Sequence, residues 1–295
     1  ERHAVEAGTG LPDSSDDVAL EPLKHIEQYT EDIEQIRRYI AAGDCYQVNH
    51  TFQLTGHFKG DLPALYHQIG RGQQAPFCSY LDSGRFTILS ASPELFFSLK
   101  GGVITTRPMK GTARRGRWSE EDVSAVEQLR SSSKEQAENL MIVDLLRNDL
   151  GIVAETGSVS VDKMFEVETY PTVHQMTSTV SAKLRNGTAL TDIFRALFPC
   201  GSVTGAPKRR SMEIIRELEK EPRGIYCGAV GYVAPGGEAL FSVAIRTLLH
   251  DKETCRMTMG IGSAVTWDSA AASEYAECLS KGEFVKAQHH DFSLI

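Results

Sequence analysis

One lysine lies in a sequence setting suited to nucleophilic chemistry. Lys110 is part of the segment Arg-Pro-Met-Lys-Gly-Thr at residues 107–112. The proline before it and the Gly-Thr turn after it fix the backbone while the amine stays mobile, which suits attack on a small electrophile. Most lysines are solvated surface charges, so this segment alone favours an ordinary surface residue. Other charged residues of the chain shift the interpretation toward chemistry.

Four glutamates form two pairs with helical spacing. They are Glu135 and Glu138 in an expected helix at residues 131–150, and Glu274 and Glu277 in another at residues 269–287, which also carries Lys281. Residues three apart share one face of a helix. Mg2+ takes one or two carboxylates and completes its shell with water and substrate oxygens. Either pair alone is typical of a solvated helix face, but together the pairs predict a magnesium site.

Three further segments could hold an anionic substrate. Arg246 interrupts an apolar stretch that we expect to be a strand at residues 239–249. A charge buried there needs a partner, which is either an internal carboxylate or a bound one. The small-residue segments 201–208 and 260–264 can bring backbone N–H groups close to an anion, although such segments are usually plain turns. Segment 201–208 lacks the spacing and the ending of an ATP-binding loop, which excludes an ATP site.

Two residues are candidates for proton transfer. Glu94 is flanked by Ser-Pro on one side and Leu-Phe-Phe on the other. Apolar surroundings would raise its pKa toward the range of a general acid, and exposure would remove that effect. His174 lies in an expected strand at residues 174–184, where a single histidine is more often structural than catalytic. Both interpretations of His174 stay open at this point.

Composition limits the class of protein. The chain has 295 residues, of which 41% are hydrophobic and 24% charged, and its net charge is −8. These values are typical of a globular protein and argue against nucleic-acid binding, while a small anionic substrate stays possible. No apolar run is long enough to cross a membrane, and the acidic first residues are unlike a signal peptide. Six dispersed cysteines without a C-x-x-C pair indicate reduced thiols in the cytoplasm.

Strands arranged in hairpins predict an α+β fold with large antiparallel sheets. We expect a mobile leader at residues 1–22, a catalytic domain at residues 23–288 and a short tail at residues 289–295. Helices are expected at residues 24–42, 131–150, 191–197, 207–218 and 269–287. Strands are expected at residues 45–54, 79–81, 86–90, 95–99, 103–106, 158–165, 174–184, 228–233, 239–249 and 254–260.

Six motifs occur in the order found in the chorismate-utilising enzymes, and the chain resembles this family over residues 36–285. The motifs are RPMKGTARRG, AENLMIVDLLRNDLG, GSVTGAPKRRSMEII, CGAVGY, AIRT and SEYAEC. The resemblance implies two large antiparallel sheets packed as a sandwich, helices on the outside and an active site between the sheets. It also implies chorismate as the substrate and Mg2+ as the cofactor.

The resemblance assigns roles to individual residues. Metal ligands would be Glu138 and Glu277, supported by Glu135 and Glu274. Groups that hold the chorismate carboxylates would be Arg246, Tyr232, Lys281, Gly262, Ser263 and Ala264, with Ser202 in a turn that contacts the substrate. His174 would lie near the groups that leave or shift at the ring. Ala264 stands where relatives often have glycine, which weakens the expected approach of that segment to the substrate.

Two positions distinguish activities within the family. Members that make anthranilate or isochorismate usually have alanine at the position of Lys110, and isochorismate-forming members usually have a lysine, the base that activates water, at the position of Gln47. Lys110 with Gln47 resembles the members that aminate chorismate to 4-amino-4-deoxychorismate. The implied route has Lys110 attack the ring while Glu94 and Mg2+ assist loss of the hydroxyl, after which ammonia displaces Lys110. This route needs a neutral amine, which we attribute to Arg107, Arg114 or burial.

The resemblance also implies a partner and leaves alternatives. Ammonia would come from a glutamine amidotransferase subunit. Anthranilate synthesis is the nearest alternative, and a catalytically inactive chorismate-binding subunit is another. Family members begin with a further segment that completes the sheets and often carries a regulatory amino-acid pocket, so this sequence is either a compact variant or part of a longer chain. The final residues, 289–295, faintly resemble the opening of a lyase domain fused to some relatives.

Overall fold

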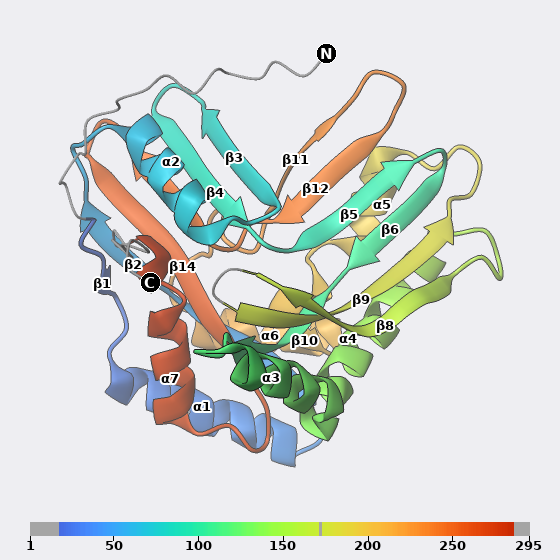
Figure 1. Ribbon diagram of the computed structural model, residues 1–295, viewed down its shortest axis with the longest axis horizontal. Coiled ribbons are helices and arrows are strands. Elements are labelled where there is room, and N and C mark those ends of the chain that lie inside the picture. The colour runs from blue at the N-terminus through green and yellow to red at the C-terminus, as the bar shows by residue number, and fades with distance from the viewer. Residues whose placement is uncertain (1–17, 171–172, 286–295) are drawn as a thin grey trace.

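A computed structural model describes residues 18–170 and 173–285. Within these ranges the chain forms two antiparallel sheets of seven strands each, accompanied by seven α-helices (Figure 1). The expected α+β class with two large antiparallel sheets and helices on the outside is therefore confirmed. The expected tail at residues 289–295 lies outside the described ranges, as does most of the expected leader.

The first sheet, sheet A, has the strand order β1-β2-β14-β13-β4-β3, with β10 paired to one end of β2. Its strands are β1 (Glu21–Pro22), β2 (Gln47–His57), β3 (Phe77–Asp82), β4 (Phe86–Ser92), β10 (Gly205–Ala206), β13 (Thr247–Asp251) and β14 (Arg256–Val265). The longest pairing joins β14 to β2 from Arg256 opposite His57 to Val265 opposite Val48. This pairing forms the centre of the sheet.

The second sheet, sheet B, has the strand order β11-β12-β5-β6-β9-β7, with β8 paired to β9. Its strands are β5 (Leu95–Lys100), β6 (Val103–Arg107), β7 (Met109–Arg114), β8 (Ser160–Thr169), β9 (Val173–Lys183), β11 (Ala229–Val233) and β12 (Ala239–Val243). The β5–β6 hairpin turns at Gly101 and Gly102, whose positive φ angles of 57° and 76° glycine adopts without strain. The hairpin expected there is confirmed.

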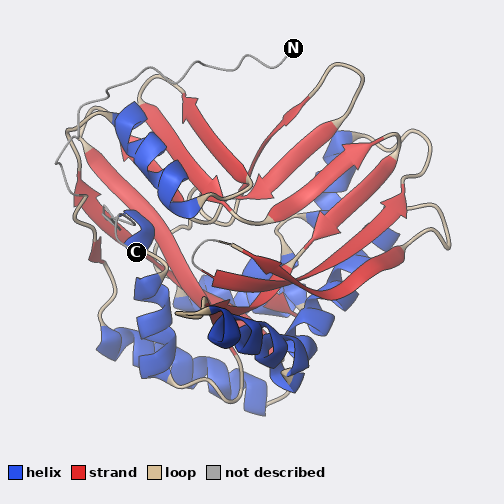
Figure 2. Ribbon diagram, viewed as in Figure 1, coloured by secondary structure: helices blue, strands red, loops and turns tan. Residues whose placement is uncertain are grey.

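Helices pack against both sheets (Figure 2). Each sheet and its helices enclose a separate apolar core. They are α1 (Ile26–Ala41), α2 (Leu62–Gln73), α3 (Ser119–Ser131), α4 (Ser133–Gly151), α5 (Leu190–Leu197), α6 (Lys208–Leu218) and α7 (Ala271–Ser280), with short 3-10 turns η1 (Gly201–Val203) and η2 (Glu283–Val285). Helix α1 is an amphipathic helix that packs on sheet A. Its residues Tyr29, Ile33 and Ile36 recur on one face and are fully buried in the core of that sheet. The core of sheet B instead packs on α4 and α5.

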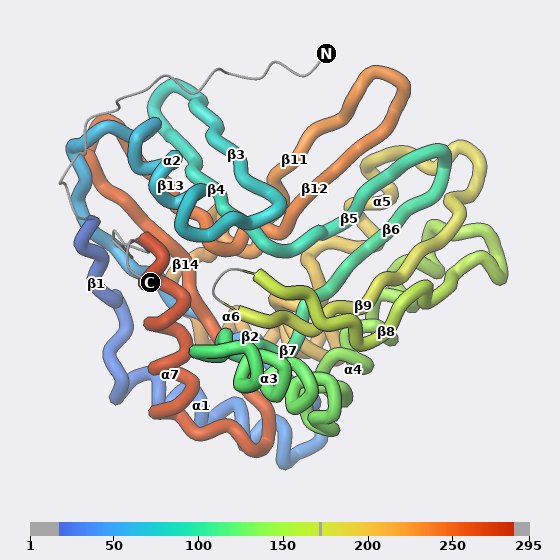
Figure 3. Tube along the Cα trace, in the orientation of Figure 1, coloured from blue at the N-terminus to red at the C-terminus, as the bar shows by residue number. Residues whose placement is uncertain are grey.

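The described chain crosses between the sheets four times, twice through segments that contain helices and twice through short links. One short link runs from β4 in sheet A to β5 in sheet B through Pro93 and Glu94, and the other runs from β12 in sheet B to β13 in sheet A through residues 244–246. Figure 3 shows both short links where the two sheets approach each other. The expected single strand at 239–249 is therefore wrong: the chain bends at Arg246, whose φ of 48° is left-handed and cannot continue a strand.

Three other expectations need correction. Residues 260–264 are not a loop but the end of β14, because each of them pairs with a residue of β2. The expected leader is too long, since Val18 is 3% exposed in the core of sheet A and Glu21–Pro22 pair with β2. The helix expected at 269–287 ends at Ser280, and η2 follows. Helices α2 and α3 were not expected from the sequence.

None of the helices in the part of the chain that the structure describes has the length and apolar character required to span a membrane.

Candidate active site

Lys110 and Glu94 lie where the two sheets meet. Glu94 belongs to the link between β4 and β5 and is 3% exposed, and Lys110 is the second residue of β7. Burial lowers the pKa of the Lys110 amine, and the positive charge of Lys281 acts in the same direction, while nearby carboxylates oppose both. Of the three causes proposed from the sequence, burial is therefore the one with the largest effect on the Lys110 pKa, while Arg107 forms an ion pair with Glu168 at 3.0 Å. A lowered pKa provides more of the neutral, nucleophilic amine near neutral pH.

The Glu94 carboxyl has the properties of a general acid. Burial raises its pKa to about 7, while the Ser202 hydroxyl, the Lys110 charge and the Met109 backbone N–H act in the opposite direction. Its Oε1 atom is buried without a hydrogen-bond partner among the described residues. A carboxyl with a pKa near neutrality can hold a proton and release it to a leaving group. The expectation from the sequence, that apolar surroundings raise the pKa of Glu94, therefore agrees with its burial.

The two glutamate pairs face the same region. Glu138 on α4 has its pKa raised by burial, and the charges of Glu135 and of Glu274 on α7 add to this effect while Lys110 opposes it. A Cβ atom on Gly111 would come within 2.9 Å of Glu135 Oε2, so that glutamate packs directly against β7. Charges from α4 and α7 thus converge on the residues around Lys110.

The carboxylates fit the chemistry of a hard cation, but they are not gathered into a cage. No group of three or more His, Cys, Asp or Glu side chains in residues 18–170 and 173–285 lies close enough together to bind a metal ion. Glu274 accepts a hydrogen bond from Ser269 at 2.8 Å, and Glu277 pairs with Lys281 at 2.7 Å. Mg2+ needs only one or two protein carboxylates, because water and substrate oxygens complete its shell.

Arg246 borders a small cleft that also reaches Met109 of β7, the strand that carries Lys110. The cleft is lined by Gln73, Met109, Tyr170, Gln175, Arg246 and three smaller apolar residues. Arg246 donates a hydrogen bond to Gln73 Oε1, and burial lowers its pKa. No carboxylate of the described residues forms an ion pair with Arg246, which leaves its remaining donors available for a bound anion.

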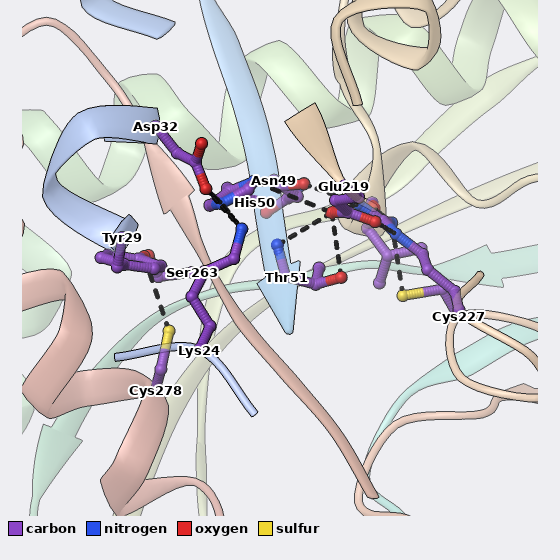
Figure 4. Close-up of polar contacts among 12 residues, drawn as sticks. Lys24, Tyr29, Asp32, Asn49, His50, Thr51, Glu219, Cys227, Ser263 and Cys278 are labelled. Atoms are coloured by element: carbon purple, nitrogen blue, oxygen red, sulfur yellow. Dashed lines mark hydrogen bonds and ion pairs between the residues drawn. The ribbon is translucent and has the colours of Figure 1, made fainter. Parts of the chain in front are cut away.

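The end of β14 lies beside Lys281. The Lys281 amine donates to the Gly262 carbonyl at 2.9 Å. A side chain at Gly262 would come within 2.6 Å of the His50 carbonyl, so glycine permits the close approach of β14 to β2. The Ser263 hydroxyl lies 2.9 Å from the Tyr29 hydroxyl, and Figure 4 shows these two side chains next to each other. Ala264 pairs with Asn49 of β2.

Ser202 and Gln47 complete the group. Ser202 lies in the buried turn η1, and its hydroxyl lowers the pKa of Glu94. Gln47 begins β2, is 0% exposed, and both polar atoms of its side chain have no hydrogen-bond partner among the described residues. Buried amides are rarely left without hydrogen bonds, so a small polar molecule at this position would supply the partners that the Gln47 amide lacks.

Two expected site residues are not brought together with the rest. The ring of His174 is held on both sides, by Asp122 Oδ1 at 2.8 Å and by Thr169 Oγ1 at 3.0 Å. Tyr232 is 61% exposed on the edge strand β11. Neighbours along a strand point to opposite faces, and the residues of β9 that line the cleft are Val173 and Gln175 rather than His174. The alternation of the expected strand could have indicated Gln175, whereas Gln73 lies on a helix that the sequence did not predict.

Comparisons with known proteins identify the family. A family model described as "chorismate binding enzyme" matches residues 5–287. The chain is 44% identical to aminodeoxychorismate synthase component 1 of Klebsiella aerogenes over 255 residues, and 40% identical to anthranilate synthase component 1 of Aquifex aeolicus over 257 residues. The crystal structure of anthranilate synthase component I from Streptococcus pneumoniae superimposes with a TM-score of 0.85 at 33% identity, covering 92% of this chain. The chain belongs to the chorismate-binding enzyme family.

The alignments also define how much of these relatives the chain represents. It covers 56% of the Klebsiella protein, 52% of the Aquifex protein and 60% of the Streptococcus structure, while 86%, 87% and 92% of this chain are aligned. The chain therefore spans little more than half the length of the relatives it matches.

The raised pKa of Glu94 predicts a stability that depends on pH. Between the ordinary pKa of 4.5 and about 7, the folded protein keeps a proton on Glu94 that the unfolded chain has released, so folding stability falls as pH rises through this window. In Glu94→Gln this fall is absent. The variant should therefore gain about 2–3 kcal/mol relative to the wild type between about pH 5 and about pH 8. Urea unfolding at both pH values measures the gain, and an equal difference at both would contradict the assignment.

Proposed function

We propose that the protein aminates chorismate at carbon 4 with ammonia, giving 4-amino-4-deoxychorismate for the synthesis of p-aminobenzoate and folate. The observation that carries this proposal is a partly buried lysine, Lys110, whose pKa is lowered by burial and which lies beside the proton-bearing carboxyl of Glu94. Its relatives named aminodeoxychorismate synthase component 1, at 41–44% identity, support the choice of reaction.

In the proposed route, the neutral Lys110 amine forms a bond to the ring carbon at the far end of the diene from the hydroxyl. The double bonds shift, the carbon–oxygen bond at carbon 4 breaks, and Glu94 supplies the proton with which the oxygen leaves as water. Ammonia then adds at carbon 4, the double bonds shift back, and the bond to Lys110 breaks. Two displacements with allylic shift place the amine where the hydroxyl was, and the net change is loss of water and gain of ammonia.

The other residues of the site bind and orient in this proposal. Arg246 holds a substrate carboxylate at the cleft, and Lys281 with the end of β14 holds the second. Gln47 offers its unpaired amide to the incoming ammonia, and Ser202 keeps the Glu94 carboxyl in place. Mg2+ on Glu138 and Glu277 would supply Lewis-acid stabilisation of substrate oxygens.

The source of ammonia and the location of the protein belong to the same proposal. The relatives are named as component 1 of their enzymes, which supports a second component that delivers ammonia, and we take this component to be a glutamine amidotransferase. All six cysteines are free thiols, which suits a cytoplasmic enzyme.

The covalent route predicts an adduct when ammonia is withheld. Incubation with chorismate and Mg2+ should add the mass of chorismate minus water to the wild-type protein, and peptide mapping should assign the addition to Lys110. Lys110→Ala should show no addition. Lys100→Ala, a matched change at an exposed lysine in the β5–β6 turn, should behave like the wild type. An adduct that persists in Lys110→Ala, or none in a wild type that turns over with ammonium, would refute the covalent step.

The proposed metal site predicts selective loss of Mg2+ affinity. Glu138→Gln and Glu277→Gln should each weaken Mg2+ binding in the presence of chorismate by roughly tenfold to a hundredfold, since each removes a charged oxygen ligand. Calorimetric titration of the metal measures this directly. Glu213→Gln, an exposed helix position on α6, serves as the control and should leave the affinity unchanged. Unaltered Mg2+ affinity in both site variants would exclude these carboxylates as ligands.

A further inference from the structure

The turn that carries Ser202 is held from outside the site by a small polar network. The turn comprises η1 and Thr204, and its residues are buried. Its hydroxyl at Ser202 acts on the Glu94 carboxyl, and it also lies 3.2 Å from Cys200 Sγ. Because Glu94 must present its proton to one substrate oxygen, the position of this turn matters to the proposed reaction.

Three successive carbonyl oxygens of the turn accept hydrogen bonds from two residues. Asn49 Nδ2 donates to the Ser202 carbonyl at 2.9 Å, and the Asn49 backbone N–H donates to the Thr204 carbonyl at 2.8 Å. Arg223 Nη1 donates to the Val203 carbonyl at 2.7 Å. The backbone that follows the Ser202 side chain is therefore fixed by two residues that do not line the proposed substrate cleft.

Arg223 is itself locked by a carboxylate. Its Nε and Nη2 atoms donate to the two oxygens of Glu219 at 2.8 and 2.7 Å, and Nη2 also donates to the Asn49 carbonyl at 2.8 Å. Glu219 further accepts from the backbone N–H and the hydroxyl of Thr51, both at 2.9 Å. Figure 4 shows Glu219 beside β2, joined by dashed lines to Thr51. The Arg223 and Glu219 side chains are 16% and 7% exposed.

We propose that Arg223 is a positioning residue for the amination reaction: together with Asn49 it fixes the buried turn that carries the Ser202 hydroxyl. This inference rests on the proposed function for its catalytic consequence, while its geometric content stands apart from it. The chemistry of the side chain matters, because the planar guanidinium reaches four oxygen acceptors and the Cys227 sulfur at once from three nitrogen atoms. A lysine carries its charge on one atom and cannot reproduce this fork.

The network is better suited to specifying geometry than to adding stability. A buried ion pair usually contributes little net stability, because removing two charges from water offsets most of their attraction. Here Arg223 donates to the Val203 and Asn49 carbonyls and Glu219 accepts from the Thr51 N–H, so each of these bonds to the backbone falls on β2 or on the Ser202 turn. The network therefore fixes the turn relative to the strand that begins with Gln47.

A double-mutant cycle tests the proposal. Arg223→Lys should lower kcat roughly tenfold to a hundredfold with ammonium as the amine donor, with a smaller change in KM for chorismate, because misplacement affects the chemical step. In a Ser202→Ala background the same substitution should lower kcat less than about threefold, since the two residues act through one contact. Equal losses in both backgrounds would overturn the proposal.

The control and the second variant keep the test decisive. Arg85→Lys alters another two-pronged arginine–carboxylate pair, with Asp251, remote from the site and at 3.0 and 2.7 Å, and should leave kcat unchanged. If Arg223→Lys does not fold, Asn49→Ala, which removes the donor to the Ser202 carbonyl, should give the same loss and the same dependence on Ser202.

A titration of Glu94 tests the geometry without turnover. The carboxyl band that disappears in Glu94→Gln can be followed by infrared spectroscopy against pH. Ser202→Ala should raise the Glu94 pKa above its value of about 7, because it removes the hydroxyl that stabilises the charged form, and Arg223→Lys should raise it in the same direction. A wild-type Glu94 pKa in Arg223→Lys, together with a raised pKa in Ser202→Ala, would overturn the positioning role. A wild type that does not aminate chorismate would refute the proposed function and leave this titration to decide the geometry.

Discussion

The properties of the site depend on the partial burial of one amine, that of Lys110. Lys110 lies where sheet A meets sheet B, and burial lowers its pKa against the attraction of Glu138, Glu94 and Glu277. A lysine buried alone would be costly, and one fully paired with carboxylates would stay protonated. Desolvation and partial neutralisation by carboxylates together leave an amine that can act as a nucleophile. Burial has the opposite effect on the pKa of Glu94, which it raises, and so leaves a carboxyl that can act as an acid.

The fold creates this environment by crossing the chain between two sheets. Each sheet has its apolar core on the side of its helices, so the crossings bring polar residues together at the junction. Glu94 lies on the short link from β4 to β5, and Arg246 lies on the short link from β12 to β13. The strands end at both links, and at Arg246 the backbone is left-handed. Helices α4 and α7, which belong to different sheets, bring their carboxylates to the same place.

Sequence patterns predicted the fold class, the β5–β6 hairpin and most of the core helices, because periodicity and turn residues are local. They also gave Glu94, Lys110, Glu138 and Arg246 as site residues through the motifs that surround them. The break at Arg246 was not predictable, because an apolar run reads as one strand when its sheet partners are unknown. The cleft residue Gln73 was missed for another reason: it lies on α2, a helix that the sequence patterns did not predict.

We propose that Lys110 and Glu94 together replace the ring hydroxyl of chorismate by an amine at the same carbon. The most direct measurement is the structure of the product formed from chorismate, Mg2+ and 15N-ammonium, determined by NMR. The account predicts 4-amino-4-deoxychorismate with 15N bonded to carbon 4 and with the pyruvate side chain retained. Anthranilate, with nitrogen at ring carbon 2 beside the carboxyl-bearing carbon and pyruvate released, or isochorismate without nitrogen, would contradict it.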